Sequence, residues 1–201
     1  QARLAMHAVD QLQAGFDFDT WPVRMATLGA AVKSPVAPTE KREVIAVGIE
    51  MIDTLMHRDD YETAGSLAVA MLDIARRARD KTLLEAVVAR RTRAAELLTS
   101  YKSARSAFEL LKADPDNVDA NLTAGKFYLF AKADWDRALP LLAKGSDKLF
   151  ATAATAEITK PDTAAEKHKL ADTWWTLAEA QDDSAAKRLL QSRALAWYQS
   201  S

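Results

Sequence analysis

The sequence predicts an all-α fold, a right-handed α-solenoid built from stacked helical hairpins. Only six Gly and six Pro interrupt the 201 residues, which leaves room for long helices. Apolar residues recur every three or four positions along most of the chain. An aromatic residue followed three positions later by Ala stands at three expected helix starts, at spacings of 40 (Tyr61 to Tyr101) and 34 (Tyr101 to Trp135) residues. Such a period is typical of helical-repeat arrays.

Residues 1–38 are expected to form the N-terminal helices. The first ends near Gly15, and its apolar positions are Leu4, Ala8, Val9 and Leu12. After a turn at 16–19, the second runs from Trp21 to about Lys33, with Asp19 or Thr20 as its cap. A connector with two prolines follows.

Residues 39–113 are expected to form two hairpins. Asp59 and Asp60 separate the first two helices, and Asp80 ends the second. The third and fourth helices are predicted over 83–98 and 101–113, because the aromatic-to-alanine pattern at Tyr101 resembles a helix start.

Residues 114–146 form the clearest hairpin. Asp116 or Asn117 is expected to cap its first helix and Asp134 its second. Gly125 and Ala138 are small enough to let the two backbones approach closely. Pro140 is expected to kink the second helix or to shorten its start.

Residues 147–201 are expected to hold an extra helix without a partner, followed by a C-terminal hairpin. Trp174 and Trp175 are adjacent in that hairpin and therefore point about 100° apart on a helix. Burial of both between neighbouring helices is the default expectation. The alternative is that one is buried and the other is an exposed interface anchor.

Several residues resemble the tetratricopeptide repeat. Its small and large positions are matched, with one extra residue between the helices, by Gly125, Tyr128, Ala138, Leu142 and Gly145. Residues from about 40 to 198 also resemble a tetratricopeptide-like module of large planctomycete proteins, through the segments DPDNVDANL, GKFYLF, DWDRALPLLAKGSD, LADTWWTLAEA and RALAWYQ. This resemblance implies a bacterial helical module within a longer protein that is often exported or held in the cell envelope, and it supplies no catalytic residue. The chain begins at Gln1, so we interpret it as a fragment or processed product whose missing part carried any signal peptide.

Composition argues against several kinds of chemistry. The chain has no Cys, which excludes disulfides, thiolate zinc sites and a Cys nucleophile. The three His lack metal-ligand spacing. The spacing of Asp114, Asp116 and Asp119 does not fit a calcium loop, so these aspartates are expected to be cap and turn residues. A net charge of −1 and the lack of an apolar run near ~20 residues argue against nucleic acid and membrane insertion. We therefore expect no cofactor, no metal and no enzymatic activity.

Charge is spread unevenly along the chain. Residues 76–105 carry nine basic and three acidic side chains, whereas residues 1–75 carry six basic and eleven acidic ones. The basic stretch could bind an acidic peptide, an anionic polymer or its own neighbour, or its charges could simply pair between adjacent helices. The function expected is a non-catalytic scaffold that binds a peptide or partner domain; the alternative is a structural spacer or self-assembling subunit. The candidate partner-binding residues are Arg90, Arg91, Arg93, Asn121, Lys126 and Phe130.

Overall fold

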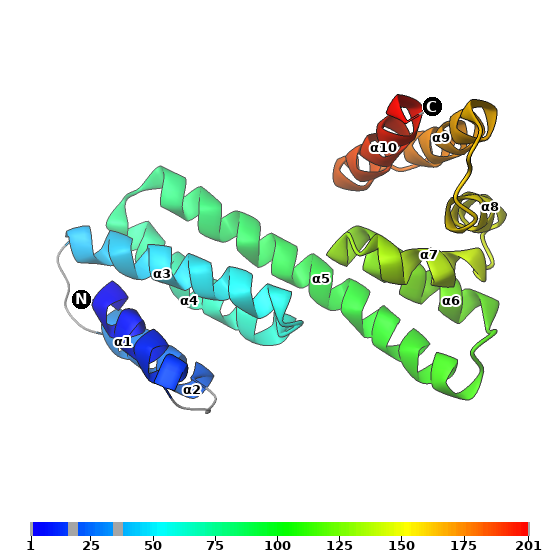
Figure 1. The fold of residues 1–201 in the computed structure, drawn as a ribbon. Helices are drawn as coiled ribbons and strands as arrows, with labels where there is room; N and C mark the ends of the chain where they lie inside the picture. Colours follow the sequence, from blue (N-terminus) through cyan, green and yellow to red (C-terminus); the bar gives the residue numbers. More distant parts are fainter. Residues whose placement is uncertain (1, 16–19, 34–37, 201) are drawn as a thin grey trace. The chain divides into compact units, whose positions relative to one another are not determined.

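A computed structural model describes residues 2–15, 20–33 and 38–200. Every regular element in these ranges is a helix that packs against neighbours, so the all-α prediction is confirmed (Figure 1). The chain divides by its internal contacts into two compact units, Gln1–Leu98 and Thr99–Ser201. The single repeat domain expected over 1–201 stays a prediction, and the turn at 16–19 and most of the proline connector lie outside the described residues. Within those ranges, none of the helices combines the length and hydropathy that a membrane crossing requires.

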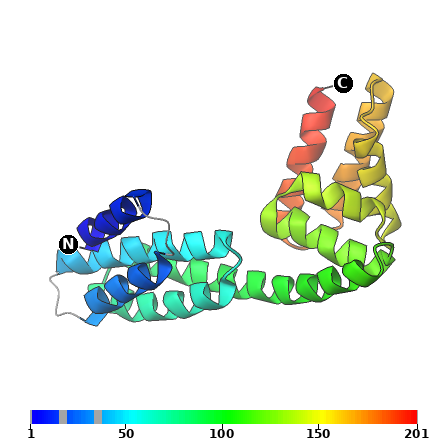
Figure 2. The same ribbon diagram turned by 60° about the horizontal axis from the view of Figure 1, so that its bottom comes forward.

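The first unit is organised around the hairpin of α3 and α4. Its helices are α1 (Ala2–Gly15), α2 (Trp21–Lys33), α3 (Pro38–His57), α4 (Tyr61–Ala78) and the first part of α5 (Lys81–Ala113). Gly48 permits the close α3–α4 approach, because a Cβ there would lie 2.2 Å from the sulfur of Met71. Asp60 caps α4 by accepting the backbone N–H of Thr63 at 3.2 Å. Val87 and Ala94 of α5 complete this core, and both ribbon views show α3, α4 and the start of α5 side by side (Figures 1 and 2).

The prediction of two helices over 83–98 and 101–113 is wrong, because α5 runs without a break from Lys81 to Ala113. Neither Gly nor Pro stands between the two expected helices, so nothing in the backbone requires a stop. Ser103 fits the helix by donating its hydroxyl to the carbonyl of Thr99 at 3.5 Å. Residues 39–113 therefore hold three helices rather than two hairpins.

The second unit begins in α5 and adds a series of shorter helices. These are α6 (Val118–Lys126), the π-helical η1 (Phe127–Ala131), α7 (Trp135–Ala143), α8 (Lys148–Ile158), α9 (Ala164–Glu179) and α10 (Ser184–Gln199). Asn117 caps α6 and Asp134 caps α7, as predicted. Gly125 is a close-approach position, because a Cβ there would lie 2.8 Å from Cγ of Leu142.

The π-helical turn η1 lies between α6 and α7, where the resemblance inferred from the sequence has one extra residue. A π-helix accommodates an added residue by widening one turn. The backbone N–H of Asp134 returns to the carbonyl of Tyr128 at 2.9 Å, and Ala133 takes a left-handed φ of 51° before α7 begins. Pro140 lies inside α7, whose start at Trp135 is not shortened.

The extra helix α8 is paired, contrary to expectation. It packs against both α7 and α9, and its buried face contains Phe150, Ala153, Ala154 and Glu157. The expected C-terminal hairpin is present as α9 and α10, which run side by side in both views (Figure 2). A capping box on Thr163 and Glu166 starts α9 after the break at Pro161.

Candidate functional site

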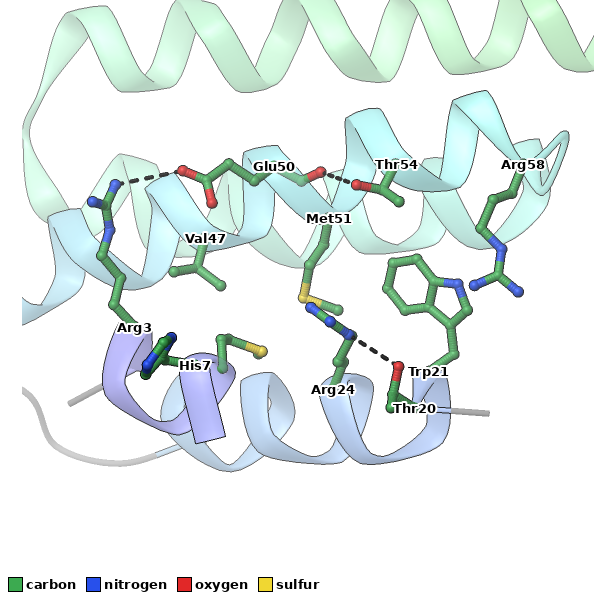
Figure 3. Close-up of a pocket in the computed structure, with 11 residues that line it drawn as sticks. Arg3, His7, Thr20, Trp21, Arg24, Val47, Glu50, Met51, Thr54 and Arg58 are labelled. Atoms are coloured by element: carbon green, nitrogen blue, oxygen red, sulfur yellow. Dashed lines mark hydrogen bonds and ion pairs between the residues drawn. The ribbon is translucent and has the colours of Figure 1, made fainter. Parts of the chain in front are cut away.

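A pocket of about 550 Å³ lies in the first unit between α1, α2 and α3; we call it the α1–α3 pocket (Figure 3). It is lined by Arg3, Met6, His7, Thr20, Trp21, Arg24, Val47, Glu50, Met51, Thr54 and Arg58. This volume falls within the range of ligand-binding pockets.

Helical periodicity explains how α3 supplies one wall. Val47, Glu50, Met51 and Thr54 occur at steps of three and four residues, so they share one face of the helix. Val47 and Met51 are buried, while Glu50 and Thr54 are exposed at the edge. The wall is therefore apolar in depth and polar at its rim.

The opposite walls come from α1 and α2. Met6 of α1 is buried, at 7% exposure, and completes an apolar floor with Val47 and Met51. The carbonyl of Thr20 accepts the backbone N–H of Arg24 at 2.9 Å, and its hydroxyl accepts the Arg24 Nε–H at 3.3 Å. This local pairing at the start of α2 directs the Arg24 side chain toward α3 (Figure 3).

Cationic side chains lie at both ends of the pocket. At one end Arg3 forms an ion pair with Glu50 at 3.4 Å. At the other, the guanidinium of Arg58 stacks over the Trp21 ring, 5.1 Å from its centroid. Figure 3 places Arg24 between these ends.

A backbone contact holds α1 against α3 beside the pocket. The N–H of Arg3 donates to Oε1 of Glu43 at 2.9 Å. This hydrogen bond lowers the pKa of the Glu43 carboxyl below its ordinary 4.5, because it stabilises the ionised form. The position of one pocket wall is thus tied to the charge of Glu43.

The predicted arginines on α5 lie outside this pocket. Arg90 forms a two-pronged pair with Asp53 of α3, with Nε and Nη2 each 2.9 Å from a carboxylate oxygen. Arg93 lies 3.6 Å from Glu96 in its own helix, and the Arg91 side chain is exposed. Arg90 thus shows the expected alternative of charges pairing between adjacent helices, whereas Arg93 pairs within its own helix.

The other three predicted residues belong to the second unit. Asn121 is only 1% exposed, and its amide donates to the carbonyls of Pro115 and Asn117 at 2.9 Å each, so it organises the turn before α6. Lys126 lies 4.8 Å from the centre of the Phe150 ring. Phe130 packs edge-on against the same ring, with centroids 6.2 Å apart. Lys126 and Phe130 therefore meet at Phe150.

The tryptophan pair is split between core and surface. Trp174 is 0% exposed and Trp175 is 36% exposed. The default expectation that both are buried is wrong, and the alternative of one exposed indole is confirmed.

Trp174 belongs to a buried network around Glu157 of α8. One Glu157 oxygen accepts the indole N–H groups of Trp174 and Trp197 at 2.7 and 3.1 Å. The other accepts Nε–H of Arg193 at 2.7 Å and also a second N–H of that guanidinium. These partners join α8, α9 and α10, and they occupy both oxygens, so the carboxylate acts as a structural connector.

All three histidines are exposed. In the part of the chain that the structure describes, no group of three or more His, Cys, Asp or Glu side chains is placed to hold a metal ion. No protein-family model, curated protein or solved structure matches the chain. Functional assignment therefore depends on the residues and their geometry.

Charge counts along the sequence do not indicate the α1–α3 pocket. Its arginines stand at positions 3, 24 and 58, within a stretch that carries more acidic than basic residues. The one sequence feature that indicates the pocket is the set of lining residues that share one face of α3. Folding brings the rest together from three helices.

Proposed function

We propose that this chain is a non-catalytic protein-interaction module whose partner binds in the α1–α3 pocket. We also propose that its helices form a right-handed solenoid of tetratricopeptide-like hairpins. The observation that supports the binding role is the combination of a buried apolar floor with arginines at both ends of one pocket. An apolar seat supplies burial energy, and a few placed charges orient the ligand.

The side chains at this pocket favour a protein ligand. Met6 and Met51 are flexible and polarisable, so they adapt to side chains of different shape. Arg3 is 65% exposed at the rim, where it can meet a partner's surface. Arginine is also among the residues most enriched at energetically important interface positions.

A comparative capture experiment tests this proposal. The immobilised wild-type chain, Arg58→Glu, Arg58→Gln, Lys81→Glu and Arg91→Glu would be exposed to lysate, and each captured protein would be purified and titrated calorimetrically. Arg58→Glu should abolish binding and Arg58→Gln should weaken it. Lys81→Glu is the matched control, because Lys81 is 88% exposed at the start of α5 and lies outside the pocket.

Three other results would contradict this proposal or favour the alternative. Loss of binding in Arg91→Glu alone would place the site on the α5 surface expected from the sequence, and the pocket assignment would be wrong. Capture of further copies of this chain alone would favour the self-assembling subunit. Equal capture by all variants would contradict the pocket as the binding site.

A further inference from the structure

The described side chains of residues 1–75 place more positive than negative charge at the α1–α3 pocket. Three basic side chains among them line the pocket, namely Arg3, Arg24 and Arg58. Glu50 is the one acidic side chain among the described lining residues. The described lining therefore carries a net positive charge, although the stretch as a whole is acidic.

Glu50, the acid among the described lining residues, is weakly held. The Arg3–Glu50 pair is 3.4 Å long, and its side chains are 65% and 68% exposed. Exposed pairs of this kind contribute little stability because water and salt screen them. An incoming carboxylate can replace Glu50 on Arg3 at small cost, and the planar guanidinium is suited to hold it with two hydrogen bonds.

The arginines lie on both sides of the apolar floor. Figure 3 shows Arg3 at one end, Arg58 over Trp21 at the other, and Met51 pointing into the space between α3 and α2. Met6 and Val47 line the same space and are 7% and 3% exposed. A ligand that matches this order has acidic groups on both sides of a bulky apolar group.

Resting on the function proposed above, we infer that the partner contributes an acidic peptide segment with one bulky apolar side chain between its carboxylates. The carboxylates bind Arg3 and Arg58, and the apolar side chain occupies the floor made by Met6, Val47 and Met51. Arg24 lies between these positions and adds to the local positive potential.

A panel of labelled synthetic peptides tests the inference with the whole chain. The first peptide has a central tryptophan with two acidic residues on each side. The second replaces the acids by their amides, the third replaces them by lysines, and the fourth replaces tryptophan by glycine. Indole-3-acetate serves as a free organic acid without a peptide backbone. Binding is followed by fluorescence anisotropy or, for indole-3-acetate, by calorimetry.

The acidic tryptophan peptide should bind at least about tenfold more tightly than the amide and glycine peptides, as expected for the loss of two or three charge contacts or of one apolar anchor. Its binding should weaken as salt rises from about 0.1 to about 1 M, where the Debye length falls from ~10 to ~3 Å. Arg3→Glu and Arg58→Glu should each lower its affinity, whereas Lys81→Glu should not. Circular dichroism of each variant confirms that the helices remain folded.

The remaining outcomes separate the inference from the proposed function. Preferred binding of the amide or lysine peptide at the pocket would overturn the acidic class while leaving a peptide-binding module. Pocket-dependent capture of a protein, without binding of the acidic peptide, would do the same. Binding of indole-3-acetate alone would overturn the peptide ligand, and absence of both peptide binding and pocket-dependent capture would overturn the proposed function as well.

Discussion

Replacing Glu157 by Ala should destabilise the second unit strongly. Glu157 is 5% exposed, and its carboxylate accepts hydrogen bonds from Trp174, Trp197 and Arg193. Removing the carboxylate leaves the Trp174 N–H without its acceptor in a side chain that is 0% exposed. It also removes the counter-charge of Arg193.

The size of the effect follows from which partners can reach water. A buried hydrogen-bond donor left without an acceptor lowers the free energy of unfolding by about 1–3 kcal/mol. Removing one partner of a buried ion pair lowers it by about 3–5 kcal/mol. The Arg193 side chain is 33% exposed and regains part of its hydration, which places the expected loss near the lower limit. We expect a loss of about 3 kcal/mol, or a fall in the unfolding midpoint of at least about 12 °C for a unit of this size.

Intrinsic tryptophan fluorescence during urea and thermal unfolding measures this loss. Four of the five tryptophans, all except Trp21, lie in the second unit, so the signal reports mainly on it. Glu157→Gln should fall between wild type and Glu157→Ala, because it keeps an acceptor for the indoles but loses the charge. Glu179→Ala is the control, since Glu179 pairs with Lys187 on the surface. A Glu157→Ala chain less than about 1 kcal/mol below wild type would refute the reasoning.

Further predictions concern two glycines and the pH dependence of α1. Gly125→Ala should destabilise the second unit by about 1–3 kcal/mol in urea unfolding, because the new Cβ would lie 2.8 Å from Cγ of Leu142 and 3.1 Å from its backbone nitrogen. Gly65→Ala, where a Cβ meets nothing within 4 Å, should instead stabilise α4 by about 0.5–1 kcal/mol; equal effects at both sites would contradict the packing argument. The hydrogen bond from the Arg3 N–H lowers the pKa of Glu43 in the folded chain. The contact that holds α1 against α3 is therefore fully present above the ordinary pKa of 4.5. It is lost as pH falls through the lowered pKa of the folded state. Amide-exchange protection of α1 should therefore decrease as pH falls below 4.5, and Glu43→Gln should remove this dependence; protection that is unchanged by pH in the wild type would refute the link.

The sequence predicted a turn correctly where several local signals occur together. Asp134 precedes an amphipathic stretch and was identified as a cap from the sequence, while the sequence Asp-Pro-Asp-Asn narrowed the other cap to Asp116 or Asn117. The structure shows that this cap is Asn117. The helix start expected at Tyr101 rested on one aromatic-to-alanine pattern without Gly or Pro beside it. Without such a stop, the backbone continued as α5.

The binding site was less predictable than the helices. The six candidate residues were chosen from local charge and repeat position, and they fall into two different units. Arg90 is held by Asp53, which is 37 positions away in sequence and could not be identified as its partner beforehand. The α1–α3 pocket likewise depends on the packing of three helices, which no short pattern records.

Several carboxylates of the acidic stretch act away from the α1–α3 pocket. Asp53 holds Arg90 on α5, and Asp60 caps α4. Glu43 is directed to the backbone of Arg3. These contacts connect and cap helices, and none of these carboxylates lines the pocket. The net charge of a segment therefore does not set the potential at its surface, which depends on the charges that folding places around the ligand. The α1–α3 pocket would therefore recognise a short, locally acidic segment of a partner, and the peptide panel tests this recognition.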